Sequence, residues 1–166
     1  YRTLITLAKK AQKAGVIKGI LLHQGCSNNT QKDWPVKVKR VYTRMLKELG
    51  LKEEETPRLI GERLDQSMGG VCWGHNEVIA NTHTVIPNAH VISSDKCPGA
   101  TDGLHFTAEG YRMIGKRYAE KMLTLLDSVK QIDFDTSETL FPLTPEAFNP
   151  SLYLQGTFSK VSSIIS

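Results

Sequence analysis

The spacing of hydrophobic residues switches between two patterns along the first three quarters of the chain. Apolar residues three or four positions apart predict amphipathic helices at residues 4–14, 33–49, 76–84 and 107–125. Short, nearly continuous apolar runs between them predict strands at residues 16–22, 57–62 and 89–93. Since helices and strands alternate, we expect an α/β fold, a parallel sheet with helices on both faces joined by right-handed crossovers.

Residues at the ends of these segments refine the prediction. We expect Gly15 to end the first helix, Asp33 to cap the second with Pro35 in its first turn, and Thr107 to cap the last. The run at residues 16–22 is nearly continuously apolar, which predicts a strand covered on both faces. The helical stripes expected to be buried are Val38, Val41, Tyr42, Met45, Leu46 and Leu49 in the second helix, and Tyr111, Ile114, Tyr118, Met122 and Leu125 in the last.

The character of the sequence changes after residue 128. Prolines at positions 142, 145 and 150 punctuate the remainder, whose strand-like fragments are too short for a sheet. We therefore expect residues 1–128 to belong to an α/β domain and residues 129–166 to form a linker and the start of a further, β-rich module.

The net charge of +4 is unevenly distributed. Residues 1–50 hold eleven Lys and Arg against two acidic residues, so the rest of the chain is negative. A basic surface can bind nucleic acid or a membrane, but five of these cations lie on the polar side of the 33–49 helix and no aromatic residues interleave with them to stack bases. We therefore expect no nucleic-acid partner. The less favoured alternative is that the basic side of this helix is a docking surface. No apolar run reaches the ~20 residues of a membrane span, so no membrane association is expected.

Polar residues gather in two loops, at residues 23–30 and 95–105, that follow predicted strands. In open α/β sheets, ligands bind at the carboxyl ends of the strands. The second loop ends in Asp102-Gly103-Leu104-His105. A carboxylate at this spacing can accept from one imidazole nitrogen, fix the tautomer and support the imidazolium formed when the ring takes a proton. A purely structural histidine is the alternative, because the four-residue pattern is common.

The first loop, from His23 to Asn28, concentrates amide donors at the end of a strand, where an oxyanion hole for acyl transfer would be placed. The alternative is a turn whose Asn and Ser side chains bond to their own backbone. The remaining histidines lack the spacing of zinc ligands, so no metal site is expected: His75, His83 and His90. His75 could line the rim of the site.

Three cysteines are too few for a disulfide scaffold, and none forms a C-x-x-C motif. Cys72 and Cys97 could pair, which would leave Cys26 free. Equally, all three could be small buried side chains. Spacing alone does not decide between these alternatives.

Two blocks of sequence resemble a known family. Residues 15–28 (GVIKGILLHQGCSN) and 102–111 (DGLHFTAEGY) look like the third and fifth blocks of SGNH (GDSL-like) hydrolases. They are most similar to the sialate O-acetylesterase-like acetylxylan esterases of carbohydrate esterase family six, over about residues 1–128. The resemblance implies a flavodoxin-like three-layer α/β/α sandwich and removal of acetyl groups from sugars through a serine acyl-enzyme, with no cofactor.

The resemblance also implies roles for individual residues. His105 matches the general base, Asp102 the residue that orients it, and Gln24 the amide that assists the oxyanion. We expect the substrate contacts to come from His23, Asn28 and Trp73, with Trp34 as a second ring able to stack on sugars. The alternative for both tryptophans is a structural, partly buried role.

The sequence departs from the family at two positions. Cys26 stands where the family usually has Glu, so support of the histidine would fall to Asp102. No serine here lies in the Gly-Gln-Ser-Asn type of block that carries the family's nucleophile. We therefore expect the chain to be the C-terminal portion of an esterase domain, without its N-terminal strands and inactive alone.

The expected partner is an acetylated carbohydrate, and the resemblance implies a secreted or periplasmic location. The competing hypothesis is a non-catalytic α/β carbohydrate-binding module whose polar loops hold a sugar.

Overall fold

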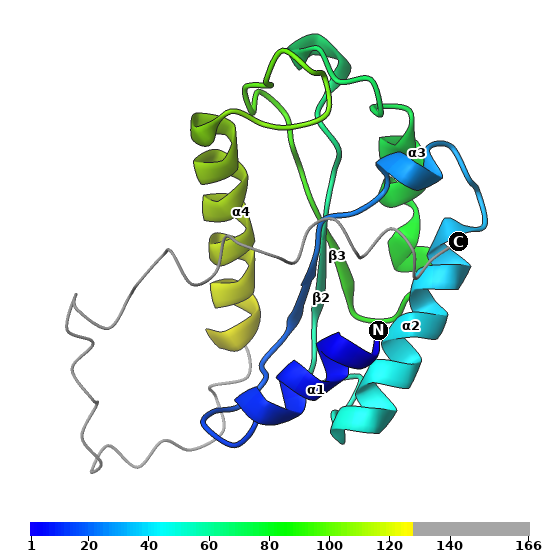
Figure 1. The fold of residues 1–166 in the computed structure, drawn as a ribbon, viewed down its shortest axis with the longest axis vertical. Coiled ribbons are helices and arrows are strands. Elements are labelled where there is room, and N and C mark those ends of the chain that lie inside the picture. The colour runs from blue at the N-terminus through cyan, green and yellow to red at the C-terminus, as the bar shows by residue number, and fades with distance from the viewer. Residues whose placement is uncertain (128–166) are drawn as a thin grey trace, which may run out of the picture.

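A three-stranded parallel sheet forms the centre of the molecule (Figure 1). The structure, a computed structural model, describes residues 1–127. The strands β1 (Ile20–Leu22), β2 (Arg58–Gly61) and β3 (Ala89–Ile92) lie in that order, with Leu21 beside Leu59 and Leu59 beside His90. The helices α1 (Arg2–Ala11), α2 (Trp34–Leu49) and α3 (His75–Ala80) cover one face, and α4 (Ala108–Asp127) covers the other. The predicted α/β fold with a parallel sheet is confirmed.

Each face of the sheet has its own hydrophobic core. Successive residues of a strand point to opposite faces, and in β2 Ile60 packs under α1 to α3 while Leu59 packs under α4, both with no exposed surface. The predicted stripe of α2 is buried except for Val41, which is half-buried. β2 is the central strand of the three, because it pairs with β1 on one side and with β3 on the other.

The prediction that the first strand is covered on both faces is wrong. β1 has three residues and lies at the edge of the sheet, where Val16 is 76% exposed and Leu21 57% exposed. Burial of an apolar run depends on neighbouring strands, and β1 pairs only with β2 among the described residues. The first helix also ends early, with Gln12 rather than Gly15 as its C-cap.

Other element ends differ in detail from the prediction. Residues 76–84 divide into α3 and a 3₁₀ turn, Thr82–Thr84. Asp33 precedes α2 but caps no backbone N–H and instead pairs with Lys37 at 3.2 Å. Thr107 does cap α4, since its Oγ1 accepts from the N–H of Gly110 at 3.2 Å. Tyr111 is predicted to be buried but is 45% exposed, because it lies at the mouth of a cavity. Its ring packs against Phe106 there.

All three cysteines are free thiols in the structure. Cys97 is fully buried under α4, and Cys72 neighbours Cys26 instead of Cys97. A Cys72–Cys97 disulfide is therefore not formed. Cys72 and Cys97 are buried, which agrees with the alternative in which they serve as small core residues, whereas Cys26 is half-buried.

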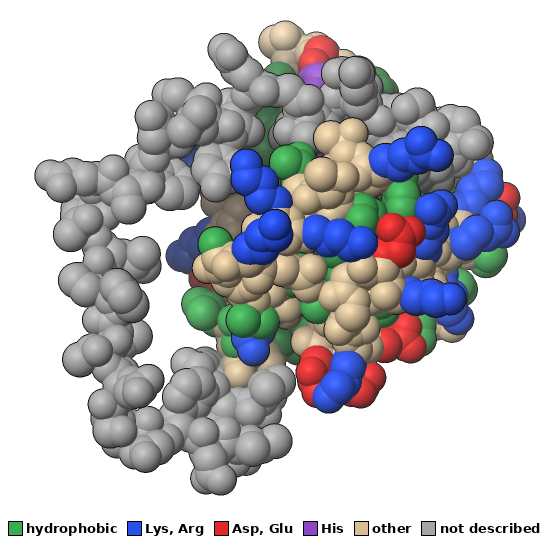
Figure 2. Space-filling model, turned by 60° about the horizontal axis from the view of Figure 1, so that its bottom comes forward, with side chains coloured by type: hydrophobic (Ala, Val, Ile, Leu, Met, Phe, Trp, Pro, Cys, Tyr) green, Lys and Arg blue, Asp and Glu red, His purple; other side chains and the backbone are tan. Residues whose placement is uncertain are grey.

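Lys and Arg side chains are numerous on the face of the molecule that Figure 2 shows. Figure 2 shows Lys and Arg side chains as separate groups with hydrophobic, acidic and uncharged surface between them. On α2, Arg44 pairs with Glu48 at 2.7 Å, in addition to the Lys37–Asp33 pair. Among residues 1–127, no helix has the length and hydrophobicity to cross a bilayer. The module predicted for residues 129–166 lies outside the described residues.

Candidate functional site

The loops at the carboxyl ends of the three strands surround a cavity of about 220 Å³. The loop after β1 supplies one wall, the segment after β2 supplies Arg63, and the approach to α4 supplies the other wall. The lining residues are His23, Gln24, Gly25, Cys26, Ser27, Arg63, Leu104, His105 and Tyr111. The two polar loops of the sequence thus meet at one site, although 79 positions separate His23 from Asp102.

Asp102 holds His105 in a defined orientation. Its Oδ2 lies 2.6 Å from Nδ1 of His105, and its Oδ1 accepts from the backbone N–H groups of Leu104 (2.9 Å) and His105 (3.0 Å). These bonds, led by that from the imidazole, hold the pKa of the Asp102 carboxyl well below its usual range. Because the Asp102 carboxylate occupies Nδ1 of His105, Nε2 is the nitrogen able to accept a proton. Nε2 has no partner among the described residues.

Gln24 is fixed by residues that the sequence suggested as substrate contacts. Its Oε1 accepts from Nε1 of Trp34 at 2.8 Å, and its Nε2 donates to Oδ1 of Asn28 at 2.9 Å. Trp34 is fully buried and Asn28 is 5% exposed. Neither side chain lines the cavity, so their part is to orient the amide. One N–H of Gln24 remains for another acceptor.

His23 forms part of the cavity wall. Its Nε2 donates to the carbonyl of Glu62 at 2.9 Å, and its ring stacks on Phe106 with centroids 5.5 Å apart. Burial, with the nearby charge of Arg63, lowers the pKa of His23 from 6.5 to about 4. The ring is therefore neutral at pH 7 and, with Nε2 protonated, presents Nδ1 as an acceptor.

His75 lies beneath the first loop, so its predicted place on the rim is wrong. The ring has no exposed surface and meets Trp34 edge-on, with centroids 4.8 Å apart. A Cβ at position 25 would collide with it, which explains why glycine stands there. Burial lowers the pKa of His75 to about 4. Trp73 is 47% exposed but does not line the cavity.

Arg63 is the cavity residue that sequence reasoning missed. It is 7% exposed and its Nη2 donates to the carbonyl of Gly61 at 2.9 Å. A signal was present, because Glu62 and Arg63 are two charged residues directly after an apolar strand, the position where α/β folds place their ligands.

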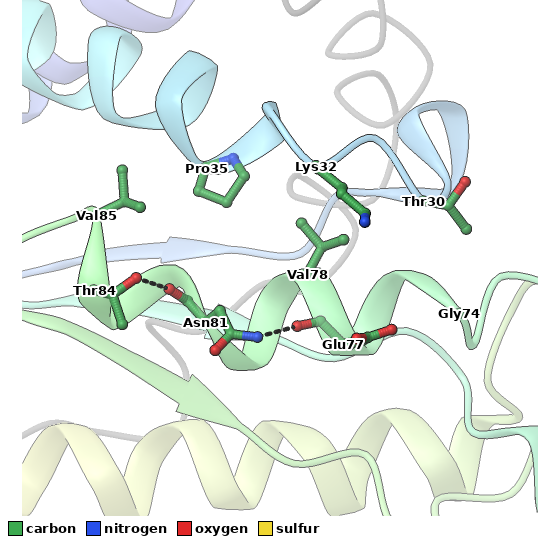
Figure 3. A pocket seen from close by; sticks show the side chains of 9 residues that line it. All are labelled: Thr30, Lys32, Pro35, Gly74, Glu77, Val78, Asn81, Thr84 and Val85. Atoms are coloured by element: carbon green, nitrogen blue, oxygen red, sulfur yellow. Dashed lines mark hydrogen bonds between the residues drawn. The ribbon is translucent and has the colours of Figure 1, made fainter.

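A second, larger cavity of about 350 Å³ lies between the N-terminus of α2 and α3 (Figure 3). Its walls combine Pro35 and Val78 with polar side chains that donate to neighbouring backbone carbonyls. Thr84 Oγ1 donates to the carbonyl of Asn81 at 2.7 Å, and Asn81 Nδ2 donates to that of Glu77 at 2.9 Å. It contains no imidazole or thiol, so the first cavity is the better candidate for chemistry.

No group of three or more His, Cys, Asp or Glu side chains in residues 1–127 is arranged to hold a metal ion. The first cavity presents an oriented imidazole, a fixed amide and a buried guanidinium. An oriented imidazole next to amide donors suits proton transfer during acyl transfer.

Comparison with known proteins agrees with this description. The family model described as "Carbohydrate esterase, sialic acid-specific acetylesterase" matches residues 1–124. Among solved structures, an Arabidopsis thaliana protein determined by X-ray crystallography superposes with a TM-score of 0.61 at 18% identity, over 75% of this chain and 52% of that one. The likeness supports the fold, and the chain spans about half the length of that relative. The chain belongs to the sialic acid-specific acetylesterase family of carbohydrate esterases.

Proposed function

We propose that this chain carries the histidine–aspartate part of the active site of a carbohydrate O-acetylesterase, which hydrolyses acetyl esters on sugars such as those of acetylated xylan. The observation that carries the proposal is the 2.6 Å contact between Asp102 and His105 on a cavity that also holds Gln24. The family match supports an esterase. We also propose a location outside the cytoplasm, in the periplasm or beyond the cell, and only the resemblance to esterases that act there supports it.

The proposed reaction is a two-step acyl transfer. Nε2 of His105 takes the proton of a serine hydroxyl, and the serine oxygen attacks the acetyl carbon. Asp102 stabilises the imidazolium, which then gives its proton to the departing sugar oxygen. In the second step His105 takes a proton from water, and the water oxygen attacks the acyl carbon. The bond between the acyl carbon and the serine oxygen then breaks, the imidazolium returns its proton to the serine oxygen, and acetate leaves. The free N–H of Gln24 is directed to the acyl oxygen while that oxygen is negative.

The mechanism also needs a nucleophilic serine. Among residues 1–127, no serine lies in the sequence context that the family's nucleophile has. We propose that it comes from a Gly-Gln-Ser-Asn type of block that precedes this chain in a longer protein. Such a block would lie beside β1, whose outer edge is unpaired among the described residues.

The test is acetate release from 4-nitrophenyl acetate and acetylated xylan by a protein that joins that block to this chain. His105→Ala is expected to lower kcat by about 10²- to 10⁴-fold, the usual contribution of a positioned base. His83→Ala, at an exposed histidine in the 3₁₀ turn after α3, is the matched control and should leave kcat unchanged. Unchanged hydrolysis in His105→Ala would contradict the proposal, and sugar binding without any hydrolysis would favour a carbohydrate-binding module.

A further inference from the structure

Arg63 is a buried cation for which residues 1–127 provide no anion. Its guanidinium makes no ion pair with an Asp or Glu of the described residues, and its Nε has no hydrogen-bond partner there. The groups that face it are thiols, phenols and imidazoles, from Cys26, Cys72, Tyr111, Tyr118, His23 and His75.

These neighbours do not neutralise Arg63. Burial raises the pKa of the Cys26 thiol and of the Tyr118 phenol, each to about 12, so both are uncharged at pH 7. The two histidines are neutral there as well, because their pKa values are about 4. Burial lowers the pKa of Arg63, yet a guanidinium keeps its proton in proteins. The cavity therefore retains one uncompensated positive charge.

A buried charge without a partner is costly and occurs where a ligand supplies the opposite charge. Arg63 lies at the inner end of the cavity, against Gly25 and Cys26, whereas Leu104 and Tyr111 at the mouth are 44% and 45% exposed. We assign the inner end of this cavity of about 220 Å³ to the small acyl group and the mouth to the sugar ring.

We propose that Arg63 binds the negatively charged acyl oxygen of the substrate, and that it holds the acetate product at the same position. This inference rests on the proposed esterase function for the identity of the anion.

The charge at that position follows from the reaction. When the serine oxygen bonds to the acetyl carbon, the electron pair of the C=O bond moves onto the acyl oxygen. An N–H of Arg63 donates to that oxygen and loses no proton. The pair then returns to form C=O, the ester C–O bond breaks, and the sugar oxygen takes the proton from His105. After deacylation the carboxylate of acetate keeps the negative charge and pairs with Arg63.

Binding can be tested on this chain without any hydrolysis. The Nε–H resonances of the arginines are followed by ¹H–¹⁵N NMR during titration with sodium acetate, at constant ionic strength, and with acetamide, a neutral molecule of the same shape. We expect a saturable shift of the Arg63 resonance with acetate alone. Arg58, which is also buried but has Glu53 as a partner, is the internal control and should not respond.

Variants separate charge from fold. Arg63→Gln is expected to weaken acetate binding by about 10- to 100-fold, as for loss of a charged hydrogen bond. Arg63→Lys, which keeps the charge, should retain part of the affinity and shows whether a loss in the glutamine variant reflects misfolding. In the longer enzyme, acetate should inhibit competitively, and Arg63→Gln should raise its inhibition constant by the same factor.

The outcomes distinguish this inference from the proposed function. Ester hydrolysis without any acetate-dependent change at Arg63 would overturn the inference and leave the esterase intact. A shift of Arg63 with glucuronate but not with acetate would also overturn it, because the anion would then belong to the sugar. Acetate binding that depends on Arg63 supports it, and the absence of hydrolysis in the longer protein would then count against the esterase alone.

Discussion

Two buried arginines lie at opposite ends of the central strand, and their surroundings differ. Arg58 begins β2 and has no exposed surface. Its guanidinium donates to the carbonyl of Pro87, lies 3.3 Å from a carboxylate oxygen of Glu53 and sits 5.7 Å from the centre of the Tyr42 ring. Arg63 follows the other end of β2, is 7% exposed, donates to the carbonyl of Gly61, and has no carboxylate partner among residues 1–127.

The difference separates a structural end of the sheet from a reactive one. At the amino end, the charge of Arg58 is matched by residues that also tie the loop before β2 to the turn before β3. At the carboxyl end, side chains of three loops converge on a cavity, and Arg63 has no carboxylate partner among residues 1–127. The Nε of each arginine lacks a hydrogen-bond partner there, so the ion pair with Glu53 is what separates the two ends.

The carboxyl end is expected to give the largest effect on activity. In the longer enzyme, Asp102→Ala should lower kcat by about 10²- to 10³-fold, because the imidazole loses both its orientation and the support for its positive charge. Asp95→Ala, in the same loop, is the control and should change kcat little. Initial rates with 4-nitrophenyl acetate measure both. Equal losses of kcat in Asp102→Ala and Asp95→Ala would show that any change in this loop impairs the enzyme. That result would contradict a specific role for Asp102 in supporting His105.

The two neutral histidines at the carboxyl end should make stability depend on pH. In the folded state, His23 and His75 stay unprotonated down to about pH 4, while the unfolded chain protonates them near 6.5. The unfolded state therefore binds more protons between these values, so stability falls as pH falls from 6.5 to 4. The loss is at most about 3 kcal/mol for each ring.

Urea unfolding of the chain at pH 7.0, 5.5 and 4.5 measures this dependence. His75→Gln should remove about half of the decrease, whatever it does to the stability at pH 7. His83→Gln, at an exposed ring, should leave the decrease as it is. If the free energy of unfolding of His75→Gln fell with pH as steeply as that of the unchanged protein, the buried ring would not take up a proton when the chain unfolds.

Exchanging each arginine for glutamine tests the comparison directly. Arg58→Gln should lower the free energy of unfolding by about 2 kcal/mol, because it breaks hydrogen bonds of a charged group whose partner Glu53 is itself half exposed. Arg63→Gln removes an uncompensated charge and should leave stability unchanged or raise it. Urea unfolding at pH 7 measures both. Equal destabilisation of the two variants would contradict the division into a structural and a reactive end.

The fold could be predicted from the sequence because its signals are local. The stripe from Val38 to Leu49 and the run at residues 89–93 gave α2 and β3 to within a few residues. The burial of β1 could not be predicted, since it depends on which strands flank it. For the same reason Tyr111, placed in the core by its helical spacing, lies at the cavity instead.

The site could be predicted only in part. Asp102 and His105 are three residues apart, so their contact follows from the loop itself. Asn28, Trp34 and His75 belong to a second layer under Gln24 and Gly25, which forms only when α2 and α3 pack against the first loop. Arg63 joins the site through the pairing of β2 with β1. The spacing of residue types along the sequence does not indicate contacts between segments so far apart in the chain.

The smallest expected effect concerns Trp73, the predicted substrate contact that the structure leaves outside the cavity. Its ring is 47% exposed and follows Cys72, which neighbours Cys26 of the first loop. An exposed tryptophan near the mouth can stack on a sugar that extends beyond the acetylated unit, so Trp73→Ala should raise KM for acetylated xylan by about 5- to 20-fold, the loss of ~1–2 kcal/mol of aromatic contact. The KM for 4-nitrophenyl acetate, which has no sugar, should stay the same, and Trp73→Phe should restore most of the affinity for the polymer. If Trp73→Ala raised KM equally for both esters, the side chain would act on the cavity itself. Trp73 would then belong to the reactive carboxyl end of the sheet, although it does not line the cavity in the structure.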